Sequence, residues 1–251
     1  MTIEKALTVF VEGFTFTRSL THSYLSARLT PNLWRLYDAP RKRPRDTYRG
    51  EEFIAFGISP EEANRLAKAA AQHKFTICYL VPEGEDDTAL RAEFKALGYR
   101  LNSTEPLMVH ELETLPHALS SRFPVTRVET PEHADELAKA ARRRMVLPEH
   151  LTMNPPPIRL YQALDEAVPQ TIGWVGSAAT SQGAWVTSLF VEKAYRRQGV
   201  GRALMAKMLT DDKATGAPVS VLLASHTGAL LYPTLGYQPL GTLYLYTPPR
   251  C

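Results

Sequence analysis

Hydrophobic residues along this 251-residue chain occur in two patterns, short continuous runs and repeats at helical spacing. Two short and nearly continuous apolar runs, 75–81 and 219–224, have the length of buried parallel strands. Apolar residues at helical spacing follow strands at 60–73 and 199–209. This alternation predicts an α/β protein.

The first half of the chain predicts elements of uneven clarity. The clearest is the helix start at Ser59, where an N-cap serine precedes Pro60 and two acids. The helix after 86 takes Asp86 or Asp87 as its cap and ends at Gly98. The other expected elements are a strand at 9–16, a helix or strand at 27–37, and strands at 52–57, 75–81 and 107–110.

The second half predicts a longer series of elements. Thr130 and Pro131 begin a helix that ends in the basic run 142–144, and a proline-rich loop follows at 145–157. Strands are expected at 125–128, 158–164, 171–179, 184–191, 219–224 and 243–246, and helices at 199–209 and 228–235.

Two segments of the chain resemble one another. Residues 93–100 end a helix with Leu-Gly-Tyr and lead into a strand, and residues 231–238 do the same. Each follows a short apolar strand, which indicates an internal repeat. We therefore expect two related domains, at 1–115 and 123–251, joined by a linker at 116–122.

Composition limits the class of protein. The formal charge is +3 at pH 7 and no apolar run reaches the length of a membrane helix, so neither nucleic acid nor a membrane is an expected partner. Cys78 lies in an apolar run and only Cys251 accompanies it, which favours a reducing, cytoplasmic setting and no disulfide framework. The N-terminus lacks the pattern of a signal peptide. The basic loop 40–45 is interpreted as solvated, although contact with an anionic ligand stays open.

The segment 189–204 carries the most specific signal. The strand Leu-Phe-Val at 189–191 leads to Gly199 and Gly201, and a helix follows. Free amides at a helix N-terminus and the helix dipole favour an anion there. Three arginines, Arg196, Arg197 and Arg202, add positive charge to the same turn. The segment therefore predicts a cradle for a pyrophosphate.

Other phosphate-binding loops do not fit this segment. The Walker loop requires Lys-Ser/Thr after its last glycine, where this chain has Arg202 and Ala203, and the dinucleotide fingerprint requires three glycines. The order Arg-x-x-Gly-x-Gly after the strand resembles instead the acyl-CoA signature of the GNAT acetyltransferase superfamily. The order of elements from 123 to 248 is also similar to a GNAT domain.

This resemblance implies specific roles for residues of the second half. The donor acetyl-CoA would bind residues Leu189, Phe190, Val191, Arg196, Arg197, Gln198, Gly199, Val200, Gly201 and Arg202. The strand at 189–191 would splay from its neighbour and offer its backbone amides. Tyr232, in Leu-Tyr-x-x-Leu-Gly-Tyr, would protonate the leaving thiolate, although Pro233 departs from the usual pattern.

The general base is the least determined residue. Glu192 is the nearest carboxylate and the catalytic candidate, and Glu149, His150 and His226 are alternatives. The histidines show no metal-ligand spacing, so no metal is expected. The acceptor is expected to be a small-molecule or amino-acid-like primary amine, and a homodimer is a candidate assembly.

The N-terminal copy of the repeat departs from the motif. It carries Phe56-Gly57-Ile58-Ser59-Pro60 where the amides should lie, and Phe94 where the other copy has Tyr232. The resemblance implies an α/β fold (α+β mixed sheet) of two GNAT-like domains in tandem, each a central mixed β-sheet flanked by helices. We expect the first domain to be degenerate and without an acyl-CoA site. The alternatives are a symmetrical two-site enzyme, a non-catalytic acyl-CoA-binding regulator, and an enzyme that takes a longer acyl chain.

Overall fold

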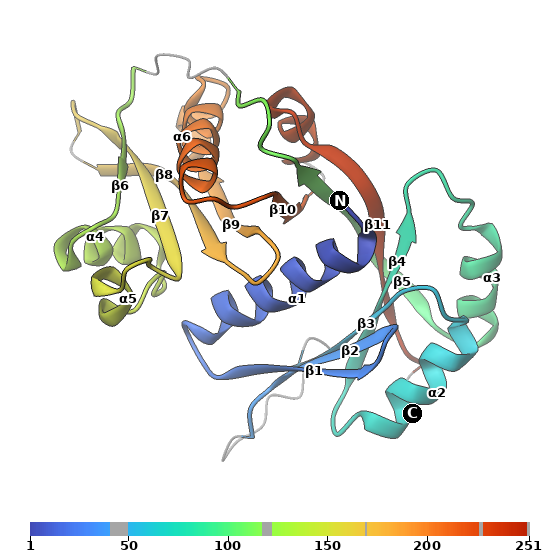
Figure 1. The fold of residues 1–251 in the computed structure, drawn as a ribbon. Coiled ribbons are helices and arrows are strands. Elements are labelled where there is room, and N and C mark those ends of the chain that lie inside the picture. The colour runs from blue at the N-terminus through green and yellow to red at the C-terminus, as the bar shows by residue number, and fades with distance from the viewer. Residues whose placement is uncertain (41–49, 117–121, 169, 226–227, 250–251) are drawn as a thin grey trace. The chain divides into compact units, whose positions relative to one another are not determined.

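The computed structural model describes residues 1–251 apart from 41–49, 117–121, 169, 226–227 and 250–251 (Figure 1). The chain forms two compact units, each of which combines segments from distant parts of the sequence. Unit 1 comprises Met1–Thr21, Val109–Leu222 and Thr227–Gln238. Unit 2 comprises His22–Met108, Leu223–His226 and Pro239–Cys251.

Unit 1 is built on strands in the order β10-β9-β8-β7-β6. The neighbouring pairs β6–β7, β7–β8 and β8–β9 are antiparallel, and β10 is parallel to β9. The strands are β6 (Val125–Arg127), β7 (Ile158–Asp165), β8 (Gln170–Ala179), β9 (Ala184–Val191) and β10 (Ser220–Leu223). These bounds confirm the strands expected from the sequence to within a few residues.

Helices cover both faces of this sheet. The helices of unit 1 are α1 (Ile3–Ser19), α4 (Pro131–Ala141), α5 (Pro148–Thr152) and α6 (Val200–Ala214). On one face, Gly173 of β8 lies so close to α6 that an added Cβ would contact Val200 and Leu204. On the other face, Phe10 of α1 packs on Trp185 of β9, with ring centroids 5.3 Å apart. The expectation of a mixed sheet flanked by helices is therefore confirmed.

The first helix corrects one prediction. Residues 9–16 were expected to form a strand because of their β-branched and aromatic content, but they lie within α1. The helix buries Leu7, Phe10 and Val11 on one side, a spacing of three and four residues. Gly13 lets α1 lie directly on β9, since a Cβ at this position would overlap Trp185. Packing has overridden propensity here.

Unit 2 contains a sheet in the order β1-β2-β3-β4-β11-β5, with most residues of its last two strands in this unit. Its elements are β1 (Tyr24–Thr30), β2 (Leu33–Asp38), β3 (Glu51–Ala55), α2 (Pro60–Ala70), β4 (Phe75–Pro82), α3 (Thr88–Ala96), β5 (Arg100–His110) and β11 (Gln238–Thr247). The strand at 75–81 and the Ser59 cap are confirmed. The segment 27–37 is not one element but a hairpin that turns between β1 and β2.

The two compact units do not coincide with the two domains expected from the internal repeat. The N-terminal helix α1 belongs to unit 1, and the last strand β11 belongs mainly to unit 2, where Leu243 pairs with Leu80 of β4. The helix expected at 228–235 is replaced by two 3₁₀ turns, η3 (Gly228–Leu230) and η4 (Tyr232–Leu235). Pro233 near the start of η4 has no amide hydrogen to continue a helix.

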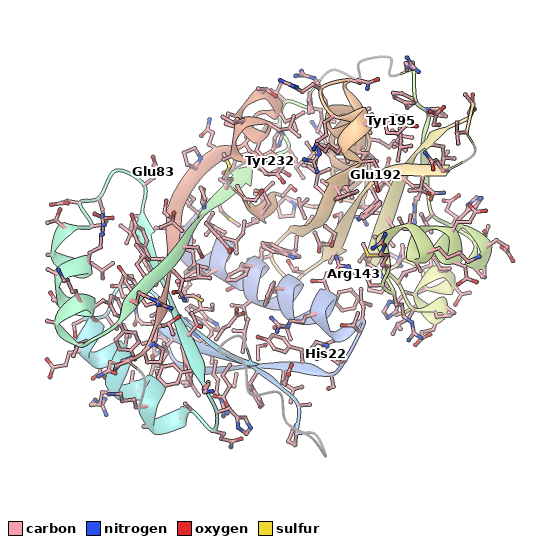
Figure 2. The ribbon with its side chains drawn as sticks, turned by 180° about the vertical axis from the view of Figure 1, so that it is seen from behind. His22, Glu83, Arg143, Glu192, Tyr195 and Tyr232 are labelled. Atoms are coloured by element: carbon pink, nitrogen blue, oxygen red, sulfur yellow. The ribbon has the colours of Figure 1, made fainter. Side chains whose placement is uncertain are left out.

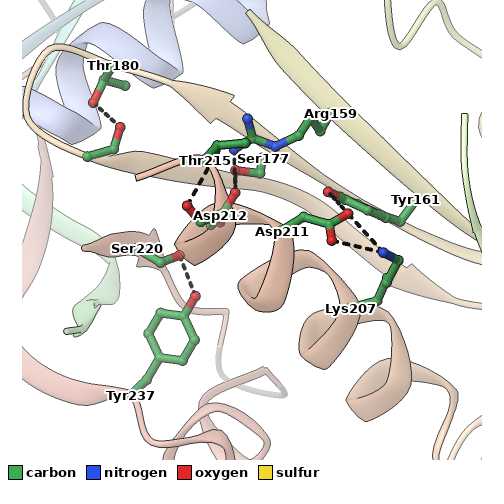
Figure 3. Close-up of polar contacts among 11 residues, drawn as sticks. Arg159, Tyr161, Ser177, Thr180, Lys207, Asp211, Asp212, Thr215, Ser220 and Tyr237 are labelled. Atoms are coloured by element: carbon green, nitrogen blue, oxygen red, sulfur yellow. Dashed lines mark hydrogen bonds and ion pairs between the residues drawn. The ribbon is translucent and has the colours of Figure 1, made fainter. Parts of the chain in front are cut away.

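A buried polar network fixes α6 to the sheet of unit 1 (Figure 3). Asp212 of α6 is fully buried and its Oδ1 accepts from Arg159 Nη2 of β7 and Ser177 Oγ of β8, both at 2.6 Å. The neighbouring Asp211 accepts from the hydroxyl of Tyr161 at 2.9 Å. The C-terminal part of α6 is thereby anchored to two strands, which holds the orientation of its N-terminus.

Three further features of the sequence concern Cys78, membrane-spanning helices and the basic loop. Cys78 is a free, buried thiol, as expected. None of the helices in the described ranges is long and apolar enough to cross a membrane. The basic loop 40–45 lies outside the described residues except for Pro40.

Candidate functional site

The central feature of the site is the separation of β9 from β10. Parallel pairing joins Ala184 to Ser220 and Trp185 to Val221, and the recorded register ends there. β9 continues to Val191, and its last five residues are only half-buried. Among the described residues, one edge of β9 is therefore open along its C-terminal part.

A β-bulge turns the strand at the start of this open edge. Between the pairs Trp174–Phe190 and Gly176–Thr187, β9 has one more residue than β8. Ser188, in the bulge, has a φ of 60°, a conformation that is uncommon outside glycine. Ser188 could not be identified from the sequence, because a bulge leaves no mark in the alternation of an apolar strand.

The bulge is contacted by a side chain from another element. Arg143 lies just after α4, whose last cap residue Arg142 is left-handed with a φ of 54°. Arg143 Nη2 donates to Ser188 Oγ at 2.5 Å. The sequence analysis noted the basic run 142–144 only as a helix end, and nothing in it shows that one member reaches β9.

The backbone of Val191 points toward the open edge. The amide of Glu192 donates to the carbonyl of Ile172 on β8 at 2.8 Å. In an antiparallel ladder neighbouring residues point to opposite sides, so the amide and carbonyl of Val191 point away from β8. The carbonyl of Val191 accepts instead from Arg196 Nε at 3.0 Å. The amide of Val191 is thus directed into the space that a partner strand would fill.

The turn after β9 exposes the first amides of α6. Arg197 and Gly199 both have positive φ, 59° and 83°. The first bond of the helix runs from the amide of Ala203 to the carbonyl of Gly199 at 2.9 Å, and Gly199 makes no side-chain cap. The amides of Val200 and Gly201 therefore have no partner within the helix, and the positive end of the helix dipole lies beside them.

Arginine side chains surround this helix start. Arg196 and Arg197 are exposed, whereas Arg202 is half-buried. Arg202 Nη1 donates to the carbonyl of Thr234 at 3.4 Å, and its Nε is buried without a recorded partner. Gln198 Nε2 donates to the carbonyl of Ala194 at 2.8 Å, which braces the turn. The site combines free amides, a helix dipole and fixed positive charge, which is the arrangement that binds anions.

Gly201 joins the helix start to the segment that carries Tyr232. A Cβ added to Gly201 would lie 3.4 Å from Leu231 Cδ2 and 3.6 Å from Val191 Cγ2. The end of β9, the first turn of α6 and the residue before Tyr232 therefore meet at this glycine. All of the donor-binding candidates and Tyr232 belong to unit 1.

Tyr232 lies at the start of η4 and is buried, with its ring 5.7 Å from that of Tyr237. Burial raises the pKa of Tyr232 to about 12. Because a buried phenol ionises less readily than an exposed one, this hydroxyl remains protonated at neutral pH. It is available as a proton donor and not as a base.

Glu192 lies in a different environment from Tyr232 (Figure 2). It is exposed and lines a pocket of about 740 Å³. The lining also includes Glu136 and Lys139 of α4 and Asp165 of β7, whose Oδ2 accepts from the hydroxyl of Tyr195 at 2.9 Å. Asp165 and Tyr195 escaped the sequence analysis because they are distant in the chain and carry no motif.

The remaining candidates for a general base are placed as follows. Glu149 and His150 lie in α5, and the ring of His150 packs 5.4 Å from that of Phe16 in α1. His150 Nδ1 is buried without a recorded partner. His226 lies outside the described residues. No group of three or more metal-ligating side chains occurs in the described part of the chain.

A family model decides the class of this site. Residues 156–239 match the model described as an acetyltransferase (GNAT) domain. This part of the chain is therefore similar to a GNAT acetyltransferase domain. The match spans β7 to η4 and so includes the open edge of β9, the arginine turn and Tyr232. The activity belongs to the class of acyl transfer.

Solved structures share the fold of the whole chain. A GCN5-related N-acetyltransferase from Kribbella flavida is 18% identical, with a TM-score of 0.64 over 100% of this chain and 97% of that one. A GCN5-related N-acetyltransferase from Sphaerobacter thermophilus is 18% identical, with a TM-score of 0.56 over 89% and 84%. A tandem GNAT protein from the clavulanic acid biosynthesis pathway is 14% identical, with a TM-score of 0.56 over 97% and 92%. A search of the curated proteins found no match.

Proposed function

We propose that the GNAT domain transfers an acetyl group directly from acetyl-CoA to a primary amine of a small or amino-acid-like acceptor. The observation that carries this proposal is the open edge of β9, which leads into the free amides at the start of α6. An extended pantetheine arm fits beside such an edge, and its pyrophosphate fits the helix start. The residues assigned to the donor are those at 189–191 and 196–202.

The chemistry of the transfer requires a hydrogen-bond donor for the oxyanion and an acid for the thiolate. The acceptor nitrogen attacks the thioester carbon, and the carbonyl oxygen takes negative charge. We assign the amide of Val191 to this oxygen, since it points into the open edge. The C–S bond then breaks, and Tyr232 gives its proton to the sulfur. Its raised pKa keeps the proton in place until that step.

Removal of a proton from the acceptor amine is the remaining step. Glu192 is proposed as the base because it follows Val191 directly and its side chain is exposed to solvent. Its carboxylate takes the proton either from the amine or from a bound water. Asp165 in the same pocket is occupied by the hydroxyl of Tyr195, so it is less available for this role.

We further propose that unit 2 contains a degenerate copy of the same domain. Its parallel strands β3 and β4 pair without interruption from Glu51–Phe75 to Ala55–Tyr79, so no edge is open between them. The first turn of α2 is closed as well: Ser59 Oγ accepts from the amide of Glu62, and Pro60 has no amide hydrogen. The described residues of this unit therefore offer no cradle for a pyrophosphate.

The residue that matches Tyr232 also supports a degenerate copy. Phe94 is fully buried and its ring is stacked 4.0 Å from that of Tyr246. It carries no hydroxyl and so has no proton to donate. The shared fold with a tandem GNAT protein is consistent with this arrangement.

The donor assignment is tested by titrating acetyl-CoA into wild type, Gly199→Asp and Gly199→Asn. The two substitutions have the same shape and both tolerate positive φ, and a Cβ at Gly199 meets no atom within 4 Å. They differ by one negative charge placed in the proposed cradle. We expect Gly199→Asp to bind at least 10-fold more weakly than Gly199→Asn. Equal affinities, or no binding by wild type, would overturn the assignment.

A second function, acyl-CoA binding without catalysis, predicts a different outcome in one assay. Release of free thiol from acetyl-CoA is followed in the presence of a panel of primary amines. The enzyme releases thiol with at least one of them, whereas a regulator binds acetyl-CoA and releases none. The retained, protonated Tyr232 favours the enzyme.

A further inference from the structure

We propose that Arg143 binds an anionic group of the acceptor, so that the preferred acceptor is an amine with a carboxylate or phosphate close to it. This inference rests on the proposed transfer to an amine. It names the class of acceptor that would bind on the face of the sheet opposite α6.

The acceptor side of the site is set by packing. One face of the sheet near Val191 is covered by α6, because Gly173 and Val191 pack against the first turns of that helix. The neighbouring pair, Trp174 and Phe190, points to the opposite face, with the two rings stacked at 4.4 Å. Phe190 is half-buried. An acceptor that reaches the open edge from this face meets an apolar ring first.

Arg143 is held beside this face. Its amide donates to the carbonyl of Ala138 at 3.1 Å, which fixes its backbone at the end of α4. Its guanidinium donates to Ser188 Oγ at 2.5 Å. Ser188 directly precedes Leu189, the first residue of the proposed donor edge. Ser188 is itself held by the bulge and by Thr187, whose Oγ1 lies 3.0 Å from Ser188 Oγ. A cation thus has a defined position at the start of the proposed donor edge.

The charge of Arg143 is not neutralised by the described residues. No ion pair is recorded between its guanidinium and a carboxylate in the described part of the chain, and the side chain is exposed. A guanidinium has five N–H donors in a planar fork. The single recorded bond leaves the others for a ligand. A carboxylate or phosphate matches such a fork in charge and geometry.

These features together define the acceptor. An amine directed at the edge of β9 would place an anionic substituent within reach of Arg143 and an apolar side chain near Phe190. Amino acids with apolar side chains meet all three requirements. Aminoalkyl phosphates meet two of them and present the same anionic chemistry to the guanidinium.

The test compares matched pairs of acceptors. Thiol release from acetyl-CoA is measured with leucine and leucinamide, with phenylalanine and its amide, and with an aminoalkyl phosphate and the corresponding amino alcohol. Wild type is expected to prefer the anionic member of at least one pair by about 10- to 100-fold in kcat/KM, the range of a lost charge-assisted hydrogen bond. The pair with the larger ratio tells carboxylate from phosphate.

The variants separate recognition from bracing of the bulge. Arg143→Gln is expected to abolish the preference, because the rate with the anionic member falls far more than the rate with the neutral member. Arg143→Lys retains charge without the fork and should keep part of the preference. Arg144→Gln is the matched control, since this exposed arginine has no recorded hydrogen bond in the described residues, and it should keep the full preference.

Three results would overturn the inference. Equal rates with both members of every pair would refute anion recognition while the proposed transfer stands. An equal loss by Arg143→Gln with both members would make Arg143 a brace for the bulge only. Absence of thiol release with every amine, although acetyl-CoA binds, would refute the proposed transfer and this inference with it.

Discussion

Replacement of Asp212 by asparagine tests the physical basis of the site, because this residue anchors the helix that carries the cradle (Figure 3). Asp212 is fully buried, and Arg159, its ion-pair partner at 2.6 Å, is only 4% exposed. Asp212→Asn keeps the shape of the side chain and removes its charge. The guanidinium of Arg159 is then left buried without a counter-charge.

The expected loss of stability follows from the burial of both partners. Breaking a buried ion pair by removing one charge costs about 3–5 kcal/mol. For a chain of this size each kcal/mol shifts Tm by about 2–4 °C, so the expected shift is about 6–20 °C downward. Thermal unfolding followed by circular dichroism measures it. A double variant, Arg159→Met/Asp212→Leu, removes both charges and should recover most of the loss.

A surface ion pair in the same helix supplies the control. Lys207 Nζ lies 2.8 Å from Asp211 Oδ1, but its side chain is 45% exposed. Exposed pairs at this spacing contribute about 0.3–0.5 kcal/mol, so Lys207→Gln should shift Tm by less than about 2 °C. If Asp212→Asn shifted Tm no more than Lys207→Gln does, the reasoning from burial would be refuted.

Three further predictions concern single residues of unit 1. Tyr232→Phe should lower kcat by about 100-fold or more without weakening acetyl-CoA binding, because a general acid contributes about 10²–10⁴; steady-state kinetics with unchanged kcat would contradict its role. Burial lowers the pKa of His110, so the contribution of this residue to stability should be present above pH 6.5 and lost as the pH falls through the lowered pKa. Urea unfolding of wild type and His110→Gln at several pH values measures this dependence. Gly13→Ala should destabilise the protein by about 1–3 kcal/mol through overlap with Trp185, despite the better helix propensity of alanine, and a stabilised variant would show that α1 lies elsewhere.

The sequence by itself determined the local features of the donor site. One continuous segment contains the apolar strand 184–191, the two glycines and the three arginines around them, so their contacts are set by short-range geometry. The N-cap at Ser59 and the buried strand β4 were predictable for the same reason. Local spacing determines how a backbone turns and which amides a helix leaves free.

Tertiary structure alone decided the features that depend on distant partners. The sequence pattern of α1 is compatible with a strand, and only its packing on Trp185 makes it a helix of unit 1. The sequence of β11 predicts a strand at the end of the second domain. Its pairing with β4 joins distant parts of the chain, and the hydrophobic periodicity does not specify that partner. The contact between Arg143 and the bulge at Ser188 has the same origin, since 45 residues separate them. Such contacts are selected by complementary surfaces in the folded chain, because the local pattern of a segment fixes its own conformation and not its partner.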